Sequence, residues 1–564
     1  MNAQFLTPIT IGKRILFALC VLIALNSCEG GSSKEGVSNT AYTRTGSSSK
    51  DMASKQSAKP MSAKRNKEAA DTKTEAPPPE INNNASDSTS VSEEEMVEIP
   101  KVIENQFLEV KSEPLSTFSI DVDNASYTLA RKSINQGRLP YASGIRIEEY
   151  VNYFQYNYPQ PKDVHPFSVN TEVAKCPWNP KNQLVHIGIQ GKQLDNSQLK
   201  PSNLVFLLDV SGSMNNSDKL PLLKKAFKVL VQNLREEDRV AIVVYAGSAG
   251  MVLPSTSGAN KQKIMEALDR LEAGGSTAGG EGIRLAYKIA KENLIKEGNN
   301  RIILATDGDF NVGESSDEAM QKLIEEKRKE GIFITVLGLG MGNYRDSKME
   351  VIADKGNGNY FYLDNLNEAY KVFGKELKGT LFTIAKDVKI QIEFNPTLVK
   401  SYRLIGYENR LLANQDFRDD TKDAGEIGAG HTVTALYEVE LYQSPRSVQI
   451  DHSKIPANFK ASKFNNEQIM AVWLRYKKPN GNTGIETNQM ISTNDQSVDN
   501  TSENYRFSAA VASFAMLLKN SQYKGSTNFN SVLKLAQSSK GKDVNGYRAE
   551  FIDLAEKASK IKAQ

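Results

Sequence analysis

Apolar residues in the central part of the chain follow two alternating patterns. Between residues 202 and 378, short continuous apolar runs such as 204–208 and 302–305 alternate with segments whose apolar residues recur every three or four positions. The runs predict strands covered on both faces, and the recurrences predict amphipathic helices, for example at 219–234 and 317–330. Strands that alternate with helices predict a mostly parallel sheet between two helical layers, an α/β fold.

Both flanks of this region show the alternation of half-buried strands instead. Residues 169–173 and 184–189 precede it, and after residue 379 the strands return without helices between them, at 388–394, 402–406, 432–441 and 470–476. This pattern predicts a β-sandwich that flanks the α/β domain or into which that domain is inserted. A stable proteolytic fragment of residues 380–564 alone would count against the insertion. Helical patterns near the C-terminus predict helices that dock on the sandwich.

The N-terminal segment has the features of an export signal. Lys13 and Arg14 precede an apolar run at 15–25, which is shorter than the ~20 residues of a spanning helix. The following Leu25-Asn-Ser-Cys28 resembles a bacterial lipobox, so we expect Cys28 to carry lipid. An ordinary signal peptide with an incidental cysteine is the alternative. The polar stretch that follows has almost no large apolar residues and predicts a disordered tether.

Together these patterns divide the chain into seven predicted segments. They are a signal peptide at 1–27, a lipidated tether at 28–98, an α+β segment at 99–165, sandwich strands at 166–198, the α/β domain at 199–379, the rest of the sandwich at 380–480 and a helical region at 481–564.

Composition removes several functional classes. The chain has 70 Lys and Arg against 67 Asp and Glu, a net charge of +3 without a basic stripe, which gives no reason to expect a nucleic-acid partner. Of three cysteines, Cys20 would leave with the signal and Cys28 would be lipidated, so Cys176 has no partner for an intrachain disulfide. Cysteines and histidines do not cluster at metal-binding spacing, which argues against a zinc site.

Hydroxyl and carboxylate side chains follow three predicted strand–helix junctions. Asp209, Ser211 and Ser213 come directly after the first apolar strand, Thr277 lies in a glycine-rich loop before a helix, and Asp307 follows the strand at 302–305. Ligands of open α/β sheets bind at the carboxyl ends of the strands, so we expect these five residues to converge. Their oxygens suit Mg²⁺, with Mn²⁺ or Ca²⁺ as rivals. Capping of the next helix by Ser213 or Thr277 is the alternative.

Such a site leaves the ion able to accept a further ligand. Two carboxylates at most balance the charge of a divalent ion, and either can act through water. The ion then retains Lewis acidity for an outside oxygen, most naturally a Glu or Asp carboxylate of a protein partner. The residues therefore predict metal-dependent adhesion.

The five residues match a known motif one by one. Residues 202–378 resemble a von Willebrand factor A domain, and Asp209, Ser211, Ser213, Thr277 and Asp307 match its metal-ion-dependent adhesion site, with Asp309 and Asn311 at the rim. The wider chain resembles bacterial lipoproteins that carry this domain between a distinctive N-terminal segment and a C-terminal domain of unknown function. Residues 118–127, 146–154 and 546–551 carry that match. The resemblance also implies that the helix at 367–377 shifts when ligand engages the metal.

The sequence therefore predicts a non-enzymatic lipoprotein of the bacterial cell envelope, held in a membrane by the lipid on Cys28. The outer membrane is favoured over the inner, but Glu29 after Cys28 does not decide between them. An assembly or chaperone scaffold for an envelope complex is one alternative. A metal-dependent hydrolase is another, but the chain has no Gly-x-Ser-x-Gly, no His-Glu-x-x-His and no P-loop, because Gly428-Ala-Gly-His-Thr432 lacks the lysine.

Overall fold

The central sheet of the α/β domain is parallel except at one edge. The computed structural model describes residues 103–276, 279–308, 317–340 and 346–563. The sheet has the order β10-β9-β8-β5-β6-β7, and only β7 is antiparallel to its neighbour. Its strands are β5 (Ser202–Asp209), β6 (Arg239–Tyr245), β7 (Ala249–Ser257), β8 (Asn299–Thr306), β9 (Ile332–Gly338) and β10 (Tyr360–Tyr362).

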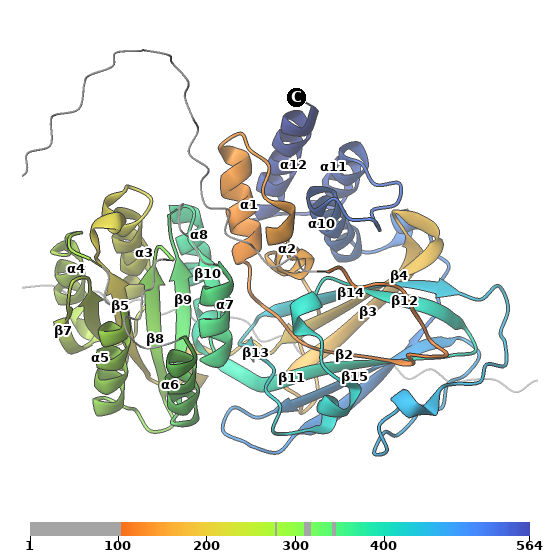
Figure 1. Cartoon of the computed structure of the whole chain (residues 1–564), viewed down its shortest axis with the longest axis horizontal. Coiled ribbons are helices and arrows are strands. Elements are labelled where there is room, and N and C mark those ends of the chain that lie inside the picture. The colour runs from red at the N-terminus through yellow and green to blue at the C-terminus, as the bar shows by residue number, and fades with distance from the viewer. Residues whose placement is uncertain (1–102, 277–278, 309–316, 341–345, 564) are drawn as a thin grey trace, which may run out of the picture. The chain divides into compact units, whose positions relative to one another are not determined.

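Helices cover both faces of this sheet, as the continuous apolar runs predict (Figure 1). Along β5, Leu204, Phe206 and Leu208 face one core, and Val205 and Leu207 face the other. The first core contains α3 (Leu220–Gln232), α4 (Lys261–Asp269) and α8 (Leu366–Tyr370); the second contains α5 (Gly279–Glu292), α6 (Asp317–Lys329) and α7 (Asp346–Lys355). The predicted α/β fold is confirmed.

The last helix of this domain is interrupted rather than continuous. Helix α8 passes into a π-helical turn at Lys371–Lys375, and α9 (Leu377–Leu381) follows. Gly374 and Gly379 lie in this stretch and have low helix propensity. Lys371 and Glu376 form a buried ion pair at 3.0 Å across the break. The helix predicted from residue 367 is therefore two short helices joined by a wider turn.

Two antiparallel sheets form the sandwich. One has the order β1-β12-β14-β4-β3 and the other β13-β11-β15-β16, with β2 paired to β11. Their strands are β1 (Leu108–Glu109), β2 (Leu115–Ser119), β3 (Phe167–Cys176), β4 (Asn179–Gly191), β11 (Thr383–Phe394), β12 (Val399–Ile405), β13 (Gly425–Gly428), β14 (Thr432–Leu441), β15 (Gln468–Lys477) and β16 (Ile485–Ser492).

Strands from before and after the α/β domain pair directly in this sandwich. Strand β4 lies against β14, with Gln183 opposite Val439 and Gln190 opposite Thr432. The α/β domain is therefore inserted into the sandwich. Strand β16 falls in the segment that the sequence predicts as helical, so the sandwich extends past residue 480 to Ser492.

A layer of helices packs on the sandwich sheet that contains β4 and β14 (Figure 1). It consists of α1 (Ala125–Asn135), α2 (Ile147–Asn152), α10 (Glu503–Lys519), α11 (Phe529–Ser538) and α12 (Tyr547–Ala563). Motif residues Tyr127, Phe154 and Phe551 lie in its core, where Phe154 contacts both other rings edge to face. The distinctive motifs therefore contribute aromatic rings to the packing of this layer. Within the described residues no helix has the length and apolar character to cross a bilayer.

Candidate metal site

The first site loop begins where the strand order of the α/β sheet changes direction. Strand β5 lies between β6 and β8, so the chain leaves its carboxyl end at the switch point of the sheet. Asp209 is the last residue of β5 and is fully buried. Its Oδ1 accepts a hydrogen bond from the backbone N–H of Ser211 at 2.8 Å, which holds the carboxylate against the loop.

The two serines of this loop face each other. The hydroxyl oxygens of Ser211 and Ser213 are 3.0 Å apart, with Ser211 buried and Ser213 exposed. Neither hydroxyl caps a helix: Ser211 precedes the 3₁₀ turn Gly212–Asn215 without a side-chain cap, and the N-cap position of α3 is Lys219. The capping alternative for Ser213 is therefore wrong, and both oxygens remain available at the edge of the sheet.

The glycine-rich loop packs directly against the first loop. The N–H of Gly274 donates to the carbonyl of Val210 at 2.7 Å, and the N–H of Gly212 donates to the carbonyl of Gly275 at 3.0 Å. Gly275 has φ +82°, a left-handed conformation that favours glycine. These two hydrogen bonds hold the glycine-rich loop against the loop that carries Ser211 and Ser213. Thr277, like Asp309 and Asn311 at the predicted rim, lies outside the described residues.

The third loop supplies the second carboxylate. Asp307 follows β8 directly, and its side chain is only 5% exposed. Its negative charge contributes to raising the pKa of Asp209, so the two carboxylates share one electrostatic environment. The structure thus brings Asp209, Ser211, Ser213 and Asp307 to the same edge of the sheet.

The donor set fits a hard cation. Oδ2 of Asp209 is buried, and the side chain of Tyr245 interacts with this carboxylate. Burial raises the pKa of Asp209 to about 6, which marks an anion in need of a counter-charge. Two carboxylates and two hydroxyls match the oxygen preference of Mg²⁺, Mn²⁺ and Ca²⁺. Groups of three His, Cys, Asp or Glu side chains placed to hold a metal do not occur among the described residues.

Sequence reasoning missed a fifth side chain at this edge. Lys219 is 7% exposed, and its Nζ lies 2.8 Å from Oδ2 of Asp307. In the sequence Lys219 is only the first residue of a predicted amphipathic helix. The sequence feature that could have identified it is its position between the serine loop and the apolar positions of the following helix.

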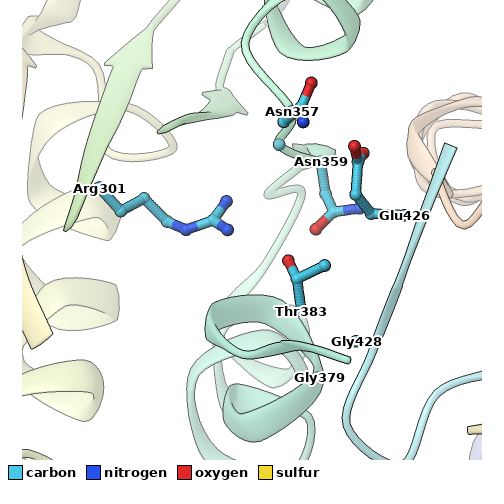
Figure 2. A pocket seen from close by; sticks show the side chains of 8 residues that line it. Arg301, Asn357, Asn359, Gly379, Thr383, Glu426 and Gly428 are labelled. Atoms are coloured by element: carbon cyan, nitrogen blue, oxygen red, sulfur yellow. The ribbon is translucent and has the colours of Figure 1, made fainter. Parts of the chain in front are cut away.

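A separate polar recess lies at the opposite end of β8 (Figure 2). Arg301 enters it from the α/β domain, and Thr383 and Glu426 line it from the sandwich. Nε of Arg301 and Oε1 of Glu426 are buried without hydrogen-bond partners in the described part of the chain. The recess has room for about one water molecule, so it suits a bridging water and excludes an organic ligand.

The fold and the oxygen-lined edge define a protein built on a von Willebrand factor A domain. A model of the von Willebrand factor type A domain matches residues 203–375, one described as von Willebrand factor matches 91–186, and one described as the C-terminal part of uncharacterized protein YfbK matches 379–561. The uncharacterized protein YfbK of Escherichia coli is 42% identical over 468 residues, which cover 81% of this chain and 80% of that protein. The chain belongs to the YfbK family.

Two solved structures also match parts of this chain. A von Willebrand factor type A protein from Catenulispora acidiphila covers 70% of this chain and 91% of its own, at 17% identity and a TM-score of 0.39. Proximal thread matrix protein 1 from the mussel byssus, with a zinc-occupied MIDAS motif, is 25% identical and covers 31% of this chain and 45% of its own, with a TM-score of 0.26.

Proposed function

We propose that this chain is a non-enzymatic lipoprotein of the cell envelope that holds a protein partner through a divalent cation at Asp209, Ser211, Ser213, Thr277 and Asp307. The two buried carboxylates of Asp209 and Asp307, at the same edge of the sheet as the hydroxyls of Ser211 and Ser213, carry the proposal, because buried carboxylates are stabilised when a cation binds them. Mg²⁺ is the natural ion, and Mn²⁺ and Ca²⁺ are its rivals. An acidic side chain of the partner would complete the coordination shell.

Binding rather than catalysis suits the residues at this edge. The four histidines of the chain all lie outside residues 199–379, so the α/β domain offers no imidazole as a general base. A carboxylate of a partner, in contrast, needs only an open position on the ion. A component of an envelope assembly would use the same open position.

Melting experiments on the full-length chain in detergent test the metal site. We expect Mg²⁺ or Mn²⁺ to raise the melting temperature, since a ligand at 100 times its Kd adds about 2.7 kcal/mol to the free energy of unfolding. Asp209→Asn keeps the shape of the side chain, removes its charge and should abolish the rise. Asp269→Asn is the matched control, because Asp269 is an exposed partner of Lys228 on the helical surface. No rise with any divalent ion would remove the metal site.

Anchoring and partner are tested in intact cells. Cys28 lies outside the described residues, and its place in a lipobox-like sequence supports lipidation. Cys28→Ala should move the protein out of the membrane fraction, and outer-membrane fractions should hold the unaltered chain. Crosslinking in intact envelope should capture a partner that is lost with chelator and in Asp209→Asn. Retention of the same partner under both conditions would contradict metal-dependent binding.

A further inference from the structure

We propose that Lys219 is a tethered cation that holds Asp307 when no metal is bound, so that a divalent ion enters by displacing an ammonium group of the chain itself. This inference rests on the metal site proposed above and concerns its regulation. Nζ of Lys219 lies 2.8 Å from Oδ2 of Asp307. The side chain of Lys219 is only 9% exposed and that of Asp307 only 5%, so the ion pair is buried.

The backbone provides a dedicated path for the lysine side chain. Gly340, just beyond the end of β9, has φ +76°, and a Cβ there would lie 2.3 Å from Cε of Lys219 and 3.0 Å from its Cδ and Cγ. The aliphatic part of Lys219 therefore lies directly against a glycine backbone. Glycine at position 340 therefore leaves room for the side chain of Lys219 on its way to Asp307.

The loop that carries Lys219 is also held from outside the domain. The preceding residue, Asp218, accepts a hydrogen bond at 2.7 Å from Nζ of Lys132 on α1. Nζ of Lys132 also lies 2.9 Å from the hydroxyl of Tyr362 on β10, and that hydroxyl donates to the carbonyl of Gly340. The segment before α3 is thus fixed to a flanking helix and to the same glycine that Lys219 crosses.

This arrangement has two physical consequences for the metal site. The ammonium of Lys219 offsets the negative charge of a buried carboxylate. When a divalent ion approaches Asp307, the ammonium competes for the same oxygen and repels the ion through like charge. Lys219 therefore lowers the affinity of the site and sets the metal concentration at which the adhesive state forms.

Titration calorimetry with Mn²⁺ on the full-length chain in detergent tests this role. Lys219→Met keeps the length of the side chain without its charge and should bind Mn²⁺ at least tenfold more tightly than the unaltered chain. Lys219→Arg retains the charge and should stay much closer to the unaltered value. Lys228→Met is the matched control, because Lys228 lies on α3, the helix that Lys219 precedes, but pairs with Asp269 at the surface. Equal or weaker binding by Lys219→Met overturns the inference.

Melting temperatures measured without metal test the pairing of Lys219 with Asp307 independently of metal binding. In excess chelator, Lys219→Met and Asp307→Asn should each lower the melting temperature, and the double variant should lose clearly less than the sum of the two. Additive losses overturn the pairing of Lys219 with Asp307. If neither the unaltered chain nor Lys219→Met binds Mn²⁺, the metal function itself fails. If both bind with equal affinity, only the role of Lys219 fails.

Discussion

Burial governs the ionisation of His186 in the sandwich. His186 lies on β4, is 3% exposed and has its Nε2 2.9 Å from the hydroxyl of Tyr158. Burial lowers the pKa of His186 to about 4. The folded chain therefore binds fewer protons at this imidazole than the unfolded chain, whose histidines titrate near 6.5.

The consequence is a loss of stability in mild acid. Because the unfolded state binds more protons between pH 6.5 and 4, stability falls as the pH drops through this window. For His186 alone we expect a loss of about 2 kcal/mol between pH 7.5 and pH 5. His186→Gln should make the unfolding free energy less sensitive to pH there, measured by urea titration. His452→Gln, at an exposed histidine, is the control. An identical pH profile for His186→Gln and the unaltered chain would contradict the prediction.

Helix α1 is joined to two other helices by one guanidinium group. Arg131 donates to Asp364 at 2.6 and 2.7 Å and to Glu368 of α8 at 2.7 Å, and it lies 3.0 Å from Glu550 of α12. Since α8 follows the last strand of the α/β domain, this cluster ties the end of that domain to the flanking helices. A ligand-driven shift of this helix, which the family resemblance implies, would have to carry or break these contacts.

Removing that guanidinium should therefore be costly. In Arg131→Met the carboxylates of Asp364 and Glu368, with side chains 3% and 0% exposed, would remain buried without their cation. We expect a loss of about 3–5 kcal/mol in the free energy of unfolding, measured by denaturant titration. Lys288→Met, which breaks an exposed pair with Glu292, should cost less than about 1 kcal/mol. Similar losses in the two variants would argue against the cluster.

The sandwich is built from strands on both sides of the inserted domain, so its folding requires both parts of the chain. Strand β14 lies between β12 and β4, and β4 comes from the part of the chain before the inserted domain. A chain of residues 380–564 would leave one edge of β14 unpaired and uncover apolar core that β3 and β4 close.

We therefore expect the fragment 380–564 to unfold without a cooperative transition. Circular dichroism during heating, together with limited proteolysis, measures this. Residues 99–564, which lack only the predicted signal and tether, should retain a sharp transition. A sharp transition in the shorter fragment would show that the sandwich does not need its N-terminal strands.

Local patterns were enough to predict the core of the α/β domain. Continuous apolar runs and helical recurrences are properties of neighbouring residues, and β5, β8 and α3 all lie close to their predicted positions. Among the strands that escaped prediction, β7 and β16 did so for local reasons. Strand β7 is an edge strand that contains Pro254, and much of β16 is only half-buried, so neither shows a clear apolar pattern.

The sequence by itself determined which residues end the strands of the α/β domain, and therefore that Asp209, Ser211, Ser213 and Asp307 meet at one edge. Only the tertiary structure decided the charge state of that edge. Lys219 and Asp307 are 88 residues apart, and their contact depends on a glycine in a third loop. Sequence spacing shows only the order of residues along the chain. Which cation lies next to a carboxylate depends on distances in the folded protein, and these are set by how the loops pack.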